Sequence, residues 1–136
     1  MSFSILNTRL GSRLESLKQN GPFYLSSPFV VNGTTVLNNN TASQALVSGI
    51  LCDITNSSVT ITFPDANTLY DLLGFDFGNY VNFDISAYAD TFPNPNTLSI
   101  VDSAGITSLL PVLSPQETYY ATLICVSLNP IKFYIM

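Results

Sequence analysis

The amino-acid sequence predicts an all-β protein, a β-sandwich or jelly roll of about eight antiparallel strands with one short helix. Apolar and polar residues alternate over residues 59–63 and again over residues 81–85, which is the period of half-buried strands. Further strand-like segments follow at spacings of about ten residues, as is typical of sandwiches and jelly rolls. We therefore expect one β body, residues 23–136, after an N-terminal helical arm, residues 1–22.

The short helix is expected between these two strands, over residues 65–73. Pro64 should end the first strand because it has no N–H to donate to a sheet. Asp65 can accept from the free N–H groups of the first helical turn, and Gly74 suits the left-handed residue that stops a helix. The leucines of this segment fall on one helical face, so the helix should close one end of the sandwich.

The first half of the β body is expected to hold a hairpin, a loop and a long strand. Residues 29–36 predict the hairpin, because Asn32 and Gly33 favour the positive φ angles of a type I′ turn. Residues 37–42 contain three consecutive asparagines and predict a loop. Residues 45–54 are apolar on both faces, which predicts a central strand or a strand with one face in an interface.

The second half begins with a proline-containing loop at residues 90–96 and a strand that starts at Leu98. Residues 106–113 predict a poorer strand, because a proline interrupts them. Residues 118–128 predict a long strand. Residues 131–136 are too apolar for an exposed tail, so we expect them to form a paired strand.

One face of the long strand at residues 118–128 is expected to be an interface between subunits. The strand is apolar on both faces, whereas a sandwich core needs only one face of each strand. The other face should therefore be buried between subunits. The residues predicted for this oligomer interface are Tyr120, Thr122, Ile124 and Val126.

The arm carries leucines at helical spacing, and Gly21 and Pro22 should end its helix. An isolated helix of this length is marginal in water, so it should order only against its own body, its symmetry mates or a partner. We expect it to dock on an acidic partner or on a neighbouring subunit. The alternative is that its charges merely solvate a short helix. The predicted partner-docking residues are Arg9, Leu10, Arg13, Leu14, Leu17 and Lys18.

Charge is unevenly distributed along the chain, whose net charge is −5. All basic residues except Lys132 lie in the arm, and residues 19–131 contain eight acidic side chains and no basic one. Such a body repels nucleic acid and anionic lipid, because binding to either requires neutralisation of phosphate. No apolar run approaches the roughly 18 residues of a membrane span, so we expect neither nucleic-acid binding nor membrane insertion.

The composition favours a surface that contacts other protein. Apolar residues make up 46% of the chain and charged residues only 10%, so neutral Ser, Thr and Asn must cover much of the surface. A surface of low charge suits association, although a stable monomer with a neutral surface is the alternative.

Little in the sequence predicts catalysis. The chain has no histidine, which removes the commonest general base and metal ligand. Cys52 and Cys125 are too few for a zinc site of the usual kind. They could form one disulfide, but their strand-like surroundings favour buried free thiols. We expect a protein without enzymatic activity, metal or cofactor.

Three segments, residues 41–51, 59–69 and 81–85, together with the end of the chain, resemble a β domain of virion structural proteins from large double-stranded DNA viruses and phages. In those proteins it forms surface and fibre-head domains. The resemblance implies a packing role and a homotrimer, with no catalytic residues. We therefore expect a minor capsid or capsid-decorating subunit, made in the host cytoplasm, that packs on or between major capsid proteins at the capsid surface.

The alternative is a receptor- or glycan-binding head of a viral surface fibre. Tyr88 and Phe92 flank Asp90 near a predicted loop, and aromatic side chains at a loop tip would favour such a head. The same side chains could instead pack in the core or at its rim. A small hydrolase or lyase is disfavoured because histidine is absent.

Overall fold

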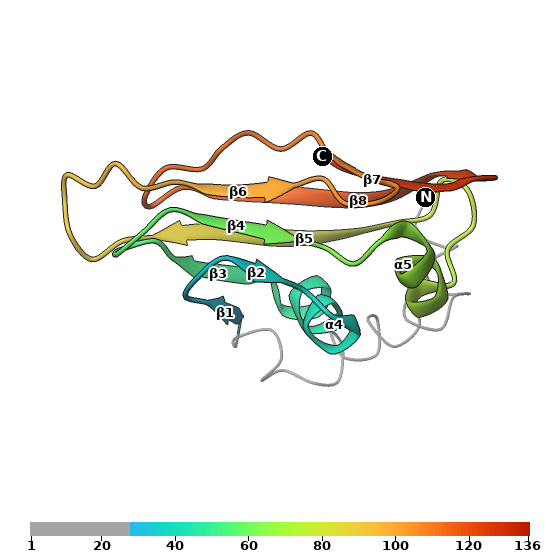
Figure 1. Ribbon diagram of the computed structural model, residues 1–136, viewed down its shortest axis with the longest axis horizontal. Coiled ribbons are helices and arrows are strands. Elements are labelled where there is room, and N and C mark those ends of the chain that lie inside the picture. The colour runs from blue at the N-terminus through green and yellow to red at the C-terminus, as the bar shows by residue number, and fades with distance from the viewer. Residues whose placement is uncertain (1–27) are drawn as a thin grey trace.

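The computed structural model describes residues 28–136, which form a β-rich fold of two sheets and two helices (Figure 1). The helical arm predicted for residues 1–22 lies outside the described residues. The elements of the described chain are β1 (Phe29–Val31), β2 (Thr35–Val36), α4 (Asn39–Ser48), β3 (Ile50–Asp53), β4 (Val59–Thr62), α5 (Ala66–Leu73), β5 (Tyr80–Tyr88), β6 (Leu98–Val101), β7 (Ile106–Ser108), β8 (Thr118–Leu128) and β9 (Ile131–Ile135).

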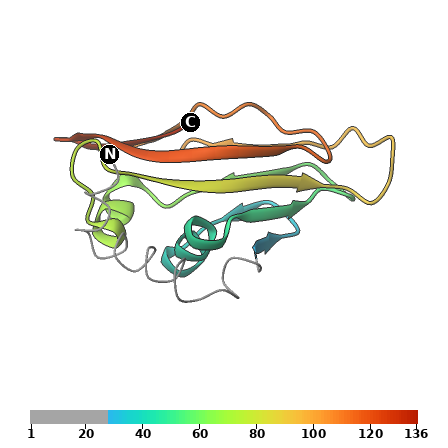
Figure 2. The same cartoon turned by 180° about the vertical axis from the view of Figure 1, so that it is seen from behind.

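The first six strands wind between two sheets. The six-stranded sheet has the order β1-β3-β5-β8-β9-β7, and the three-stranded sheet has the order β2-β4-β6. Successive strands from β1 to β6 alternate between the sheets. Each strand from β3 to β6 pairs in parallel with the strand two places before it. Figures 1 and 2 show the sheets as two layers, with the three-stranded sheet nearer the viewer in Figure 1 and the six-stranded sheet nearer in Figure 2.

The helices make this parallel winding possible. Parallel neighbours cannot be joined by a tight hairpin and need a crossover connection. Helix α4 carries the chain from β2 to β3, and α5 carries it from β4 to β5, so both helices lead from the small sheet to the large one. They lie near the same end of the strands (Figure 1).

The β-rich class that the sequence predicts is confirmed, but the antiparallel arrangement of a sandwich or jelly roll is not. Five of the seven strand pairings in the described chain are parallel, and only β8 pairs antiparallel, with β5 and with β9. The described residues also hold nine strands and two helices rather than one. Apolar alternation reports which face of a strand is buried, and it carries no information on the direction of the neighbouring strand.

The hairpin predicted for residues 29–36 is also wrong. Strand β1 pairs with β3 and β2 pairs with β4, so the Asn32-Gly33 turn leads from one sheet to the other. Neither turn residue is among those with positive φ, as a type I′ turn would require. The two short strands instead each join a longer parallel partner.

The loop predicted at residues 37–42 and the start of the strand predicted at residues 45–54 are replaced by α4. Asn38 caps this helix: its side-chain oxygen accepts from the Thr41 N–H at 2.9 Å, and the Thr41 hydroxyl oxygen accepts from the Asn38 N–H at 2.8 Å. Gly49 follows the helix with a φ of +83°, and a Cβ there would lie 3.1 Å from the Asp84 carbonyl oxygen. Only the later part of the predicted strand is extended, as β3.

The helix predicted at residues 65–73 is confirmed as α5. Asp65 is its N-cap and accepts from the Thr68 N–H at 2.8 Å. Gly74 is left-handed and ends the helix. Leu69 and Leu73 are fully buried, so the predicted apolar face packs on the protein core.

One apolar core joins the inner faces of both sheets and the two helices. Phe63, after β4, contacts Phe83 of β5 with ring centroids 5.8 Å apart. Cys52 and Cys125 are both free and buried, as predicted. Burial and the nearby Asp53 raise the pKa of the Cys52 thiol to about 11, so that thiol stays protonated and unreactive at neutral pH.

The buried face of α5 should dominate its contribution to stability. Leu69→Ala should lower the free energy of unfolding by about 2–5 kcal/mol, because it removes a fully buried side chain and leaves a cavity. Leu72→Ala is the matched control, since Leu72 lies on the same helix but is only partly buried. Urea unfolding would measure both variants, and equal losses would contradict this packing.

The N-cap carboxylate should make stability depend on pH. The bond from the Thr68 N–H lowers the pKa of Asp65, so its contribution is present above the unfolded pKa of about 3.9 and is lost as pH falls through the folded pKa. Asp65→Asn keeps an acceptor but removes the charge. The stability difference between the protein and this variant should shrink from about pH 6 to about pH 2, as measured by urea midpoints. A difference that is constant with pH would contradict the prediction.

Candidate interaction surface

The predicted oligomer interface lies on the outer face of the six-stranded sheet. Tyr120 is 77% exposed and stands opposite Asp84 of β5, whereas Thr122, Ile124 and Val126 are half-buried. On the inner face of the same strand, alternate residues are buried in the core. The long strand therefore has the bounds that the sequence predicts, and it presents the four predicted residues away from the core.

Neighbouring strands extend this apolar surface. Ile124 stands opposite Tyr80 of β5 on one side and Tyr134 of β9 on the other. Thr122 and Met136 exchange two backbone hydrogen bonds of 2.7 and 2.9 Å, which bring the Met136 side chain to the same face. We call this surface the β8 outer face, and it comprises Tyr80, Tyr120, Thr122, Ile124, Val126, Tyr134 and Met136.

The β8 outer face is unusual for an antiparallel sheet region that faces water. Such faces are normally polar, since only the opposite face packs on the core. Here the polar groups lie mainly toward β5, where the Thr122 hydroxyl donates to Asn82 Oδ1 at 2.7 Å and Ser86 and Thr118 lie 2.8 Å apart. Tyrosines and aliphatic side chains occupy the remainder, a composition that favours contact with another protein.

The sequence did not predict the contributions of Tyr80, Tyr134 and Met136. Residues 131–136 were expected to form a paired strand, and β9 confirms this. The pairing partner and the register decide which side chains meet, and neither follows from the apolar pattern of a single strand.

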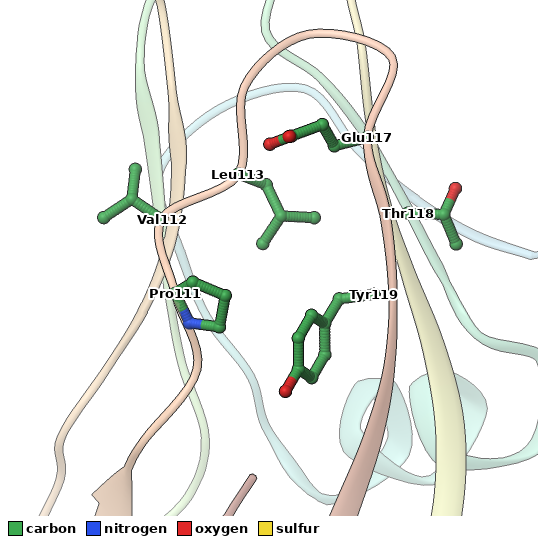
Figure 3. A pocket seen from close by; sticks show the side chains of 6 residues that line it. All are labelled: Pro111, Val112, Leu113, Glu117, Thr118 and Tyr119. Atoms are coloured by element: carbon green, nitrogen blue, oxygen red, sulfur yellow. The ribbon is translucent and has the colours of Figure 1, made fainter.

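A second surface feature is a slot between the segment before β8 and β8 itself (Figure 3). It has a volume of about 260 Å³. In Figure 3 the side chains of Leu113 and Tyr119 point into the slot, the Pro111 ring forms one wall, and Glu117 reaches over one end. Glu117 Oε1 accepts from the Ser114 N–H at 2.6 Å, which holds the carboxylate at this position.

A larger hollow of about 610 Å³ lies where the N-termini of α4 and α5 approach each other. Asn38 and Asp65 line it, and each already accepts a hydrogen bond from the first turn of its helix. These side chains therefore serve as helix caps.

Of the two aromatic side chains that would favour the alternative function, Tyr88 is the last residue of β5 and Phe92 lies in the loop that follows. Phe92 is 67% exposed and Tyr88 is 42% exposed, so neither belongs to the core. The loop is held by side-chain amides: Asn94 Nδ2 donates to the Thr55 carbonyl oxygen at 3.1 Å, and Asn96 Nδ2 donates to that of Ile54 at 2.9 Å. Figure 1 shows this loop, between β5 and β6, at one extreme of the molecule.

The predicted docking residues of the arm, from Arg9 to Lys18, lie outside the described residues. Within residues 28–136, no three His, Cys, Asp or Glu side chains gather in a way that could hold a metal ion. No helix in that part of the chain is long and apolar enough to cross a membrane. Comparisons with family models, with curated proteins and with solved structures find no match for this chain.

Proposed function

We propose that this protein is a non-enzymatic structural subunit of a viral particle, which assembles through the β8 outer face. The observation that carries the proposal is this surface of tyrosines and aliphatic side chains, with Tyr120 exposed to 77%. Tyrosine is enriched at protein–protein interfaces, and burying a large aromatic side chain there stabilises an assembly. The low charge of the chain, 10% of residues, further favours a surface that is covered by protein.

The proposed partners are copies of the same chain, as a homotrimer, and a major capsid protein at the capsid surface. The resemblance of the β segments to virion surface domains supports this part of the proposal. The acidic body supports a protein partner rather than nucleic acid, since it offers no basic surface to phosphate. A density map of the purified virion would test the location, because the subunit should occupy repeated positions on or between the capsid proteins.

Association through the β8 outer face predicts a mass about three times the 14.8 kDa of one chain in light scattering. Tyr120→Asp should dissociate the assembly without unfolding the chain, because it places a charge in the interface while the side chain contacts little of its own core. Val36→Asp is the matched control, since Val36 is 73% exposed on β2 of the other sheet.

The control variant should keep the mass of the unchanged protein. A stable monomer at micromolar concentration, or equal dissociation by both variants, would contradict assembly through this face.

A receptor- or glycan-binding head is the second candidate, favoured by the exposure of Phe92 on a loop that two side-chain amides hold in place. An exposed aromatic ring on an ordered loop can contact a ligand at little entropic cost. Phe92→Ala should then weaken binding to host-surface glycans by about tenfold or more on a glycan array. Phe77→Ala is the control, because Phe77 is 71% exposed outside this loop.

Equal binding by both variants, or no binding to any glycan by the unchanged protein, would reject the second candidate and leave the first unaffected.

A further inference from the structure

The slot between residues 111–113 and β8 has the chemistry of a site for one long basic side chain. Pro111, Leu113 and the Tyr119 ring provide apolar walls, and Glu117 provides a carboxylate at one end (Figure 3). Lysine and arginine combine an apolar stem with a charged head, so their side chains match walls of this kind. A basic head can also lie against an aromatic ring and donate hydrogen bonds to a carboxylate at the same time.

Glu117 is positioned for such a contact. Its bond with the Ser114 N–H uses one carboxylate oxygen and holds the group over the slot, and a carboxylate can accept further bonds. Among the described residues that line the slot, it alone carries a charge. The slot therefore favours a cation over an anion or a purely apolar group.

Few side chains can supply this cation in an assembly of identical chains. The chain has four basic residues, of which Lys132 alone lies in the described part. The other three, Arg9, Arg13 and Lys18, lie in the arm among leucines that suit apolar walls.

We propose that the slot binds a basic side chain from the arm, residues 1–22, of a neighbouring copy of this chain. The inference rests on the proposed function in that it requires an assembly of identical chains. The slot is then the binding site for the arm on the β body, and Glu117 and Tyr119 are the residues that contact the basic group. The arm would then connect subunits that also meet through the β8 outer face.

The test uses the full chain and trypsin, which cleaves after arginine and lysine. In the assembled protein at least one of the bonds after Arg9, Arg13 and Lys18 should be protected. Glu117→Gln keeps an acceptor for the Ser114 N–H but removes the charge, and it should speed cleavage of that bond by about tenfold. Mass spectrometry would follow each bond separately.

Asp102→Asn is the matched control, because Asp102 also accepts from a backbone N–H, that of Ser108 at 2.8 Å, and does not line the slot. It should leave the cleavage rates unchanged. Dilution below the concentration at which the assembly dissociates should remove the protection. Protection that survives dilution would mean that the arm binds the β body of its own chain, and it would overturn the proposal.

A charge exchange identifies the partner and covers the case in which Glu117→Gln disturbs the loop. Glu117→Arg should abolish protection from trypsin. Combining it with Arg9→Glu, Arg13→Glu or Lys18→Glu should restore protection in one combination only. Because trypsin does not cleave after glutamate, this protection is followed at the new glutamate with an endopeptidase that cleaves after glutamate. Rescue by Lys132→Glu instead, or by none of the four substitutions, would overturn the proposal. Protection that appears only when a capsid protein is added would also overturn it.

A monomeric mass in light scattering rejects the proposed function itself, whereas an oligomer whose cleavage is insensitive to Glu117 rejects only this inference.

Discussion

The two kinds of pairing made by β5 determine the rest of the architecture. On one side it is the last strand of the parallel series β1, β3 and β5, and on the other it pairs antiparallel with β8 over seven residue pairs. The parallel side requires crossovers, which α4 and α5 provide. The antiparallel side gives β8 a partner without a break in register. Alternate β8 residues therefore lie in the core and the others on the outer face.

Much of the fold could be predicted from the sequence where local chemistry decides the structure. The strands β4 and β8 and the helix α5 follow from alternation, from Pro64 and from the Asp65 and Gly74 caps. Helix α4 was not predicted, because Asn38 and Thr41, which form its N-terminal cap, were interpreted as part of a loop. Strand direction was also missed, because pairing joins residues far apart in the chain.

The same distinction applies to the candidate surfaces. Four residues of the β8 outer face follow from the two apolar faces of one strand, which is a local pattern. The slot depends on separate segments. Leu113 exchanges two backbone hydrogen bonds of 2.9 Å with Leu98 of β6, and these bonds place residues 111–113 across the slot from the start of β8. No periodicity in the sequence predicts such a contact. Glu117 reaches the slot only because the turn that begins at Ser114 positions its carboxylate there.

The short strands at one margin of the winding have a further consequence. Within residues 28–136, β1 and β2 end the two parallel ladders, so a fibre that extended the winding would have to add strands beside them. With only three residues in β1 and two in β2, this margin offers too little backbone to template such growth. The short length of β1 and β2 would therefore keep a concentrated protein from polymerising end to end.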